Sequence, residues 1–125
     1  MSIRVFAKPV DAWVGDVIPF AHQDRAELYY LHDLRDPARP GMAWHLYETS
    51  DFATFTYAGE AMPQGGADSP DLNVYTGSVV EADGVLHAFY TGFNAEFHET
   101  GCSARQLVMH ATRDAGRSQW VKHAE

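Results

Sequence analysis

Two hairpin-forming segments of the sequence align at one fixed offset, and this repeat limits the folds open to the chain. Asp16 and Thr76 are 60 residues apart, and so are Tyr30 and Tyr90. The segments are rich in β-branched and aromatic residues, which favours strands. The four predicted strands are Val14–Phe20, Glu27–His32, Val74–Glu81 and Val85–Gly92. The offset holds for both strands of each hairpin, so the sequence predicts a tandem duplication of a β unit.

Each predicted hairpin is followed by two further strand-like segments, which completes a unit of four antiparallel strands. These segments are Ala43–Ser50, Thr54–Gly59, Gln106–Thr112 and Ser118–His123. The turn of the second hairpin contains Asp83–Gly84, a pair typical of tight hairpin turns. No segment shows a sustained helical period with caps. We therefore expect an all-β protein.

Tandem four-stranded units are typical of a β-propeller, in which the sheets, or blades, pack around a central channel. We expect residues 1–125 to form part of one propeller domain, with blade one at about 11–61 and blade two at about 74–123. A Pro- and Gly-rich connector, residues 62–73, joins them. A closed ring takes at least about four blades. We therefore expect a fragment that continues beyond Glu125; assembly with other chains and an open two-sheet form are the alternatives.

The charge balance restricts the partners. With 9 Lys and Arg against 17 Asp and Glu, the formal net charge is -8. This argues against nucleic acid or an anionic membrane as a partner and is compatible with a neutral ligand such as a sugar. No apolar stretch approaches the length of a membrane helix.

The cysteine and histidine content argues against a metal site. Cys102 is the only cysteine, so the chain has no internal disulfide and no Cys-based zinc spacing. The seven histidines are scattered without an H-x-x-x-H or H-x-H pair. We expect no metal and no cofactor.

The first residues do not resemble a signal peptide, which favours a cytoplasmic location.

Several motifs occur in a fixed order along nearly the whole chain. They are Trp13–Pro19, the pair Tyr29–Tyr30, Trp44–Phe55, Tyr75–Ser78 and Phe89–Gly92. Together they resemble the W-x-N-D-P-N-G, W-G-H-A-T-S-x-D-L-x-x-W, F-S-G-S and F-Y-T-G patterns of glycoside hydrolase family 32, the β-fructosidase group. They resemble family 43 more distantly. The resemblance implies a five-bladed propeller, of which this chain holds the first two blades.

The family 32 resemblance implies a role for Asp16 as the catalytic nucleophile of a retaining glycosidase. It places five further residues near the sugar, namely Trp13, Trp44, His45, Tyr75 and Thr76. From the residues alone, Asp16 is equally well a solvated carboxylate, and Trp44 and Tyr75 equally well pack between blades. A family 43 relation makes Asp16 the general base of an inverting enzyme, and the separation of the two carboxyl groups decides between these mechanisms. The competing class is a non-catalytic carbohydrate-binding module.

The chain departs from the family pattern beside Asp16. Gly15 stands where the family has Asn, and Leu31 where it has Gln, so a substrate other than a plain fructoside is an open alternative. The acid/base Glu and the stabilising Asp of the family belong to its third and fourth blades. Arg35–Pro37 spells the family's R-D-P, but in a loop of blade one, where we interpret it as coincidence. We expect the chain alone to be inactive, because one carboxyl group cannot perform both halves of the reaction.

Overall fold

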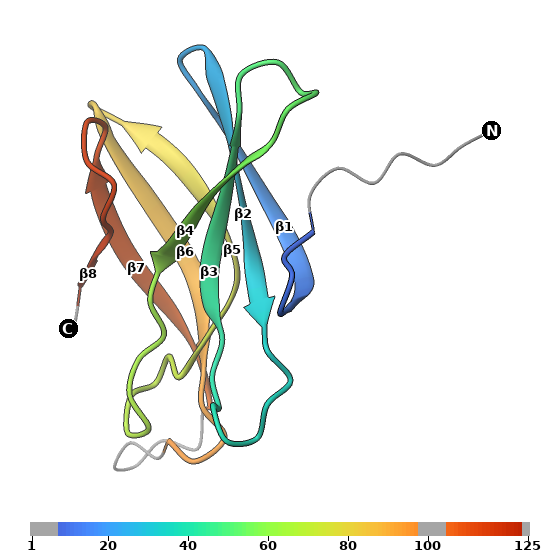
Figure 1. Cartoon of the computed structure of the whole chain (residues 1–125). Helices are drawn as coiled ribbons and strands as arrows, with labels where there is room; N and C mark the ends of the chain where they lie inside the picture. The colour runs from blue at the N-terminus through green and yellow to red at the C-terminus, as the bar shows by residue number, and fades with distance from the viewer. Residues whose placement is uncertain (1–7, 98–104, 124–125) are drawn as a thin grey trace.

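The computed structural model describes residues 8–97 and 105–123 and consists of two four-stranded antiparallel sheets (Figure 1). The first sheet has the order β1-β2-β3-β4 and the second the order β5-β6-β7-β8. The strands are β1 (Trp13–His22), β2 (Arg25–Asp33), β3 (Ala43–Thr49), β4 (Thr56–Met62), β5 (Asn73–Ala82), β6 (Val85–Phe93), β7 (Gln106–Asp114) and β8 (Val121–His123). This confirms the predicted all-β class and the two four-stranded blades.

The second hairpin turns at the predicted place. Asp83 has φ 51° and Gly84 φ 78°. Two successive residues with positive φ form the turn whose twist matches that of the flanking strands, and Asp-Gly adopts it readily. In the first hairpin Gln23 has φ 57°.

Two strand boundaries differ by three residues from the sequence-based expectation, and the others by two or fewer. The last strand begins at Val121 rather than Ser118, because Arg117 N–H donates to the Asp114 carbonyl and the reversal of the chain occupies the residues between. Strand β4 runs on to Met62, inside the predicted connector, because two register shifts let Met62 pair with Trp44. Met62 is fully buried, so this extension adds to the core.

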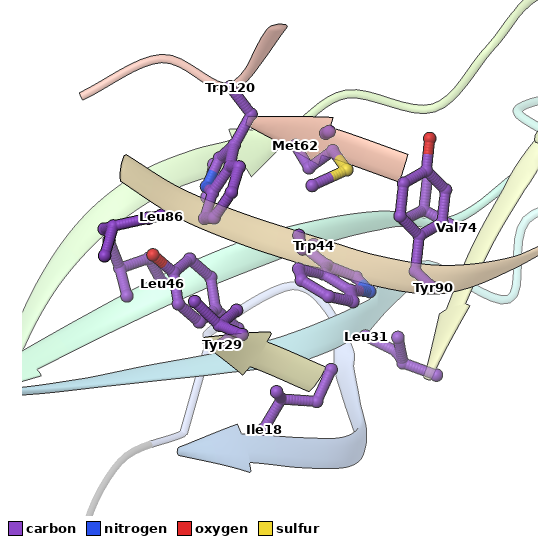
Figure 2. Close-up of a cluster of buried hydrophobic side chains, with 14 residues drawn as sticks. Ile18, Tyr29, Leu31, Trp44, Leu46, Met62, Val74, Leu86, Tyr90 and Trp120 are labelled. Atoms are coloured by element: carbon purple, nitrogen blue, oxygen red, sulfur yellow. The ribbon is translucent and has the colours of Figure 1, made fainter. Parts of the chain in front are cut away.

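The core lies between the two sheets (Figure 2). Trp44, which has no exposed surface, is at its centre. Its ring centroid is 5.6 Å from that of Tyr29 and 5.9 Å from that of Tyr90, and its Nε1–H donates to the Tyr75 carbonyl at 2.9 Å. Trp44 of the first sheet thus binds the second sheet by packing and by a hydrogen bond.

Substituting Trp44 by Phe is expected to lower the free energy of unfolding by about 1 to 3 kcal/mol, because the Tyr75 carbonyl loses its donor and a small cavity remains. Urea denaturation checks this. Trp13→Phe is the matched control, since Trp13 is 58% exposed, and it should change stability by less than about 0.5 kcal/mol. Equal effects of the two substitutions would contradict the core role of Trp44.

The two sheets pack head-to-tail. The face of the first sheet that forms the core is equivalent, at the 60-residue offset, to the uncovered face of the second sheet. Tyr29 of the first sheet faces the core, whereas Phe89, its equivalent at the 60-residue offset, is 46% exposed. Tyr90 of the second sheet faces the core, whereas its equivalent Tyr30 lies on the far side of the first sheet with Tyr47. Each sheet therefore has one face that the other does not cover.

A buried ion pair joins the sheets. Glu27 on β2 is fully buried and Arg113 on β7 is 4% exposed. Arg113 Nη2 donates to both Glu27 carboxylate oxygens, at 2.9 and 2.7 Å, and the Tyr29 hydroxyl donates to the same carboxylate. Burial, with the neighbouring Glu27, raises the pKa of Tyr29. The carboxylate is therefore fully paired away from water.

A second polar contact joins the connector to the second sheet. The carboxylate of Asp71, which is buried, accepts hydrogen bonds from the Tyr90 hydroxyl at 2.9 Å and from Lys122 Nζ at 2.6 Å. Burial raises the pKa of Tyr90, and the Asp71 carboxylate adds to that. The irregular segment between the sheets is thereby held to β6 and β8.

No helix in the described residues has the length and apolarity needed to cross a membrane.

Candidate functional site

Asp16 lies where the first strands of the two sheets meet. The pairing of β1 with β2 shifts register between Gly15 and Val17, so Asp16 is the extra residue of a β-bulge. Bulges re-aim side chains and interrupt pairing. The Asp16 side chain is exposed, and its Oδ2 accepts a hydrogen bond from Thr76 Oγ1 on β5 at 2.5 Å.

Thr76 lies in the equivalent irregularity of the second sheet. The pairing of β5 with β6 shifts register between Val74 and Gly77, a region that includes Thr76. A Cβ at Gly77 would lie 2.0 Å from the Phe89 carbonyl oxygen, so only glycine fits this close approach of the two strands. The bulges therefore coincide at the 60-residue offset, and they bring Asp16 and Thr76 together.

Trp13 and Tyr75 precede Asp16 and Thr76 on the same two strands. Trp13 is exposed, and the Arg35 guanidinium lies 4.0 Å from the centroid of its ring. Tyr75 is half-buried and stacks on Phe93 at 5.3 Å. Arg35, which begins the R-D-P sequence, thus contacts a predicted sugar-binding residue, a role that its position in a loop between β2 and β3 did not suggest.

Trp44 and His45 are not part of this group. Trp44 is fully buried between the sheets, so it belongs to the core. This agrees with the alternative, given above, that Trp44 packs between blades. His45 lies two strands away from β1 in the first sheet. Its ring stacks on His32 at 3.6 Å, and its Nδ1 is hydrogen bonded to the Tyr57 hydroxyl at 2.6 Å. Of the six predicted residues, Asp16, Thr76, Trp13 and Tyr75 therefore occupy β1 and β5, and two do not.

Burial, and next to it the neighbouring His32, lowers the pKa of His45 to about 4. The unfolded chain therefore binds a proton at His45 that the folded chain does not bind between pH 6.5 and 4, so stability falls as the pH is lowered through this window. Because the ring is only partly buried, we expect a loss of about 1 kcal/mol. Urea denaturation at pH 7.5 and 4.5 measures it, and His45→Gln should reduce the drop. An unchanged drop in the variant would contradict this assignment.

Within residues 8–97 and 105–123, no three His, Cys, Asp or Glu side chains are grouped so as to hold a metal ion. The polar groups of the site are the carboxylate of Asp16 and the hydroxyl of Thr76, and Trp13 and Tyr75 lie on the same two strands. Carboxylates and aromatic rings are side chains suited to sugars, which present both hydroxyl groups and C–H patches.

Two four-stranded blades packed head-to-tail correspond to part of a β-propeller, and the sequence comparison identifies the family. Residues 7–125 match the model of the glycosyl hydrolases family 32 N-terminal domain. The chain belongs to this family. A comparison with curated protein sequences finds no match.

Three solved structures illustrate the likeness in fold. Fructan 1-exohydrolase IIa from Cichorium intybus superposes with a TM-score of 0.72 at 20% identity, over 96% of this chain and 22% of that enzyme. β-Fructofuranosidase from Schwanniomyces occidentalis gives 0.73 at 14% identity, over 95% and 25%. Sucrose-6-phosphate hydrolase from Lactobacillus gasseri gives 0.70 at 21% identity, over 90% and 22%. The chain thus spans about a quarter of the length of these structures or less.

Proposed function

We propose that this chain supplies the catalytic nucleophile, Asp16, of a retaining glycoside hydrolase that acts on a fructoside or a related glycoside. The observation that carries the proposal is the position of Asp16, an exposed carboxylate at a bulge between the first strands of two blades, held by Thr76 at 2.5 Å. The hydrogen bond fixes one carboxylate oxygen and leaves the other available for attack on the anomeric carbon.

A retaining mechanism needs a second carboxyl group about 5 to 5.5 Å away, which protonates the leaving group and then activates water. An inverting mechanism needs about 6.5 to 9.5 Å. We place the second group in further blades of the complete protein, following the family pattern. The 125-residue chain alone is therefore inactive in this proposal.

The uncovered faces support further blades. The far side of the first sheet has a cavity of about 450 Å³ lined by apolar and aromatic side chains, among them Val17, Tyr30 and Tyr47. On the second sheet, Phe89, Val108 and Val121 are exposed by 46%, 84% and 60%. Such apolar surface is suited to burial against another sheet. Through the repeat, the uncovered face of each sheet is equivalent to the face that the other sheet uses in the existing contact. We therefore propose that blades of the same type cover both uncovered faces.

The surroundings of Asp16 favour a substrate that differs from a plain fructoside. Gly15 pairs with Leu31 across β1 and β2, and a Cβ at Gly15 would lie 3.2 Å from the Leu31 Cβ. The two positions are therefore packed together and apolar, with no amide to bind a sugar hydroxyl. Trp13, which is 58% exposed and has Arg35 over its ring, offers aromatic surface instead. We propose that the ligand contacts this side of the site by C–H groups.

Covalent trapping tests the assignment. The complete protein is incubated with a fructosyl analogue whose enzyme adduct hydrolyses slowly, and the labelled peptide is identified by mass spectrometry. Screening with sucrose, sucrose 6-phosphate and 1-kestose comes first and identifies the substrate. We expect the label on Asp16. A label on another carboxylate would refute the role of Asp16. Inversion at the anomeric carbon would make Asp16 a general base, and sugar binding without hydrolysis would favour the carbohydrate-binding module.

The coding sequence provides an independent check. If the reading frame continues past Glu125, the proposal expects a strand-borne R-D-P and a later acid/base Glu. If the frame contains neither, the enzyme assignment fails.

A further inference from the structure

An open cavity of about 410 Å³ lies between the two sheets, with β3 and β4 on one side and the turn between β7 and β8 on the other. Its volume is within the range of about 300 to 1,000 Å³ that is usual for small-molecule sites. Small residues leave this space, namely Ala58, Ala61, Ala115 and Gly116. We call it the inter-sheet cleft. All the residues that line it belong to the described part of this chain.

The charges of the inter-sheet cleft are nearly balanced. Its charged lining residues are Arg25, Arg113, Arg117, Glu48 and Glu60. Each arginine already has a carboxylate partner. Arg25 lies 3.4 Å from Glu27 and 3.9 Å from Glu48, Arg113 lies 2.7 Å from Glu27, and Arg117 lies 3.6 Å from Asp114. The two glutamates would repel a phosphate, and the three guanidinium groups would repel a cation. A neutral ligand avoids both repulsions.

The lining of the cleft combines hydrogen-bonding groups and apolar surface. Ser118 and Gln119 provide an exposed hydroxyl and an exposed amide, while Leu46 and the alanines provide apolar surface. The Arg113 side chain forms part of the inner wall, and its Nε is buried and makes no hydrogen bond within the described residues. A sugar matches such a lining, because it carries hydroxyl groups that donate and accept and C–H patches that pack.

We propose that the inter-sheet cleft is a second binding site, which takes a neutral, hydroxyl-rich ligand such as a mono- or disaccharide. It is separate from the Asp16 site. In the strand orders, Asp16 lies on β1, at one end of the first sheet, and the cleft lies at β3 and β4, at the other end. Occupancy of the cleft therefore does not require Asp16.

Nuclear magnetic resonance of the ¹⁵N-labelled 125-residue chain tests the proposal, with sucrose as the probe and inorganic phosphate in parallel. We expect the Arg113 Nε–H signal and the backbone amides of residues 116–119 to shift saturably with sucrose. The Nε–H signal of Arg39, in the loop after β2, should not shift. Ser118→Ala and Gln119→Ala each remove one exposed hydrogen-bonding group and should weaken binding about fivefold. Asp16→Asn should leave this titration unchanged.

Three results would overturn the inter-sheet site. Saturable shifts with phosphate but not with sucrose would make the cleft an anion site. Sucrose shifts at Asp16 and Thr76 without shifts at Arg113 would leave only the Asp16 site. Shifts that rise linearly with sucrose concentration everywhere would show a solvent effect and no site.

Discussion

Replacing Arg113 by alanine is expected to lower the free energy of unfolding by about 3 to 5 kcal/mol, because the buried Glu27 carboxylate then keeps only the longer contact with Arg25 Nη2, at 3.4 Å. Glu27 is fully buried, and Arg113 Nη2 reaches both of its oxygens at 2.9 Å or less. The two residues belong to different sheets, so the substitution also loosens the contact between the blades. Urea denaturation followed by circular dichroism measures the loss.

Arg117→Ala is the matched control for Arg113→Ala. Arg117 is four residues further along, its side chain is 79% exposed, and its ion pair with Asp114 is 3.6 Å long. Surface pairs of this kind contribute little, so we expect a change of less than about 0.5 kcal/mol. The double variant Glu27→Ala/Arg113→Ala should lose less stability than the sum of the two single variants, by about 1.5 kcal/mol or more. Additive losses would mean that the two charges act independently.

The fold was predictable because its main determinant is periodic in the sequence. The offset between Tyr30 and Tyr90 identifies equivalent strands without any knowledge of long-range contacts, and Asp83–Gly84 specifies its turn locally. Local backbone preference and alternation decide both features. Strand β8 was predicted too long, because the place where pairing with β7 begins depends on the tertiary position of the turn after Asp114.

The surroundings of the site were predictable only where they follow from the repeat. Asp16 and Thr76 meet because each lies at a bulge on a first strand, and the offset relates the two positions. The sequence could not show which face Trp44 uses, since a strand tryptophan serves a ligand surface or a core equally well. The pairing of Glu27 with Arg113, 86 residues apart, has no local signal at all. Side-chain partners that join different blades require the three-dimensional arrangement.

Asp16→Asn is expected to reduce kcat of the complete protein about 1,000-fold or more, because an amide cannot form the glycosyl-enzyme ester that the retaining mechanism needs. The substitution keeps the shape of the side chain, and the Asn carbonyl oxygen still accepts the hydrogen bond that Thr76 now donates to Asp16. The free energy of unfolding should therefore change by less than about 0.5 kcal/mol. Initial rates of sugar release and urea denaturation together separate a catalytic loss from a folding defect.

Asp83→Asn is the control for the change of charge in Asp16→Asn. Asp83 lies in the tight turn of the second hairpin with φ 51°, a conformation that Asn adopts as easily as Asp. This variant loses the same charge just beyond the end of β5, seven residues from Thr76, so its kcat should equal that of the unmodified protein. If Asp16→Asn keeps most of the activity, Asp16 is not the nucleophile. If both variants lose activity, the loss follows net charge or solubility, and the bulge of β1 has no special part in the reaction.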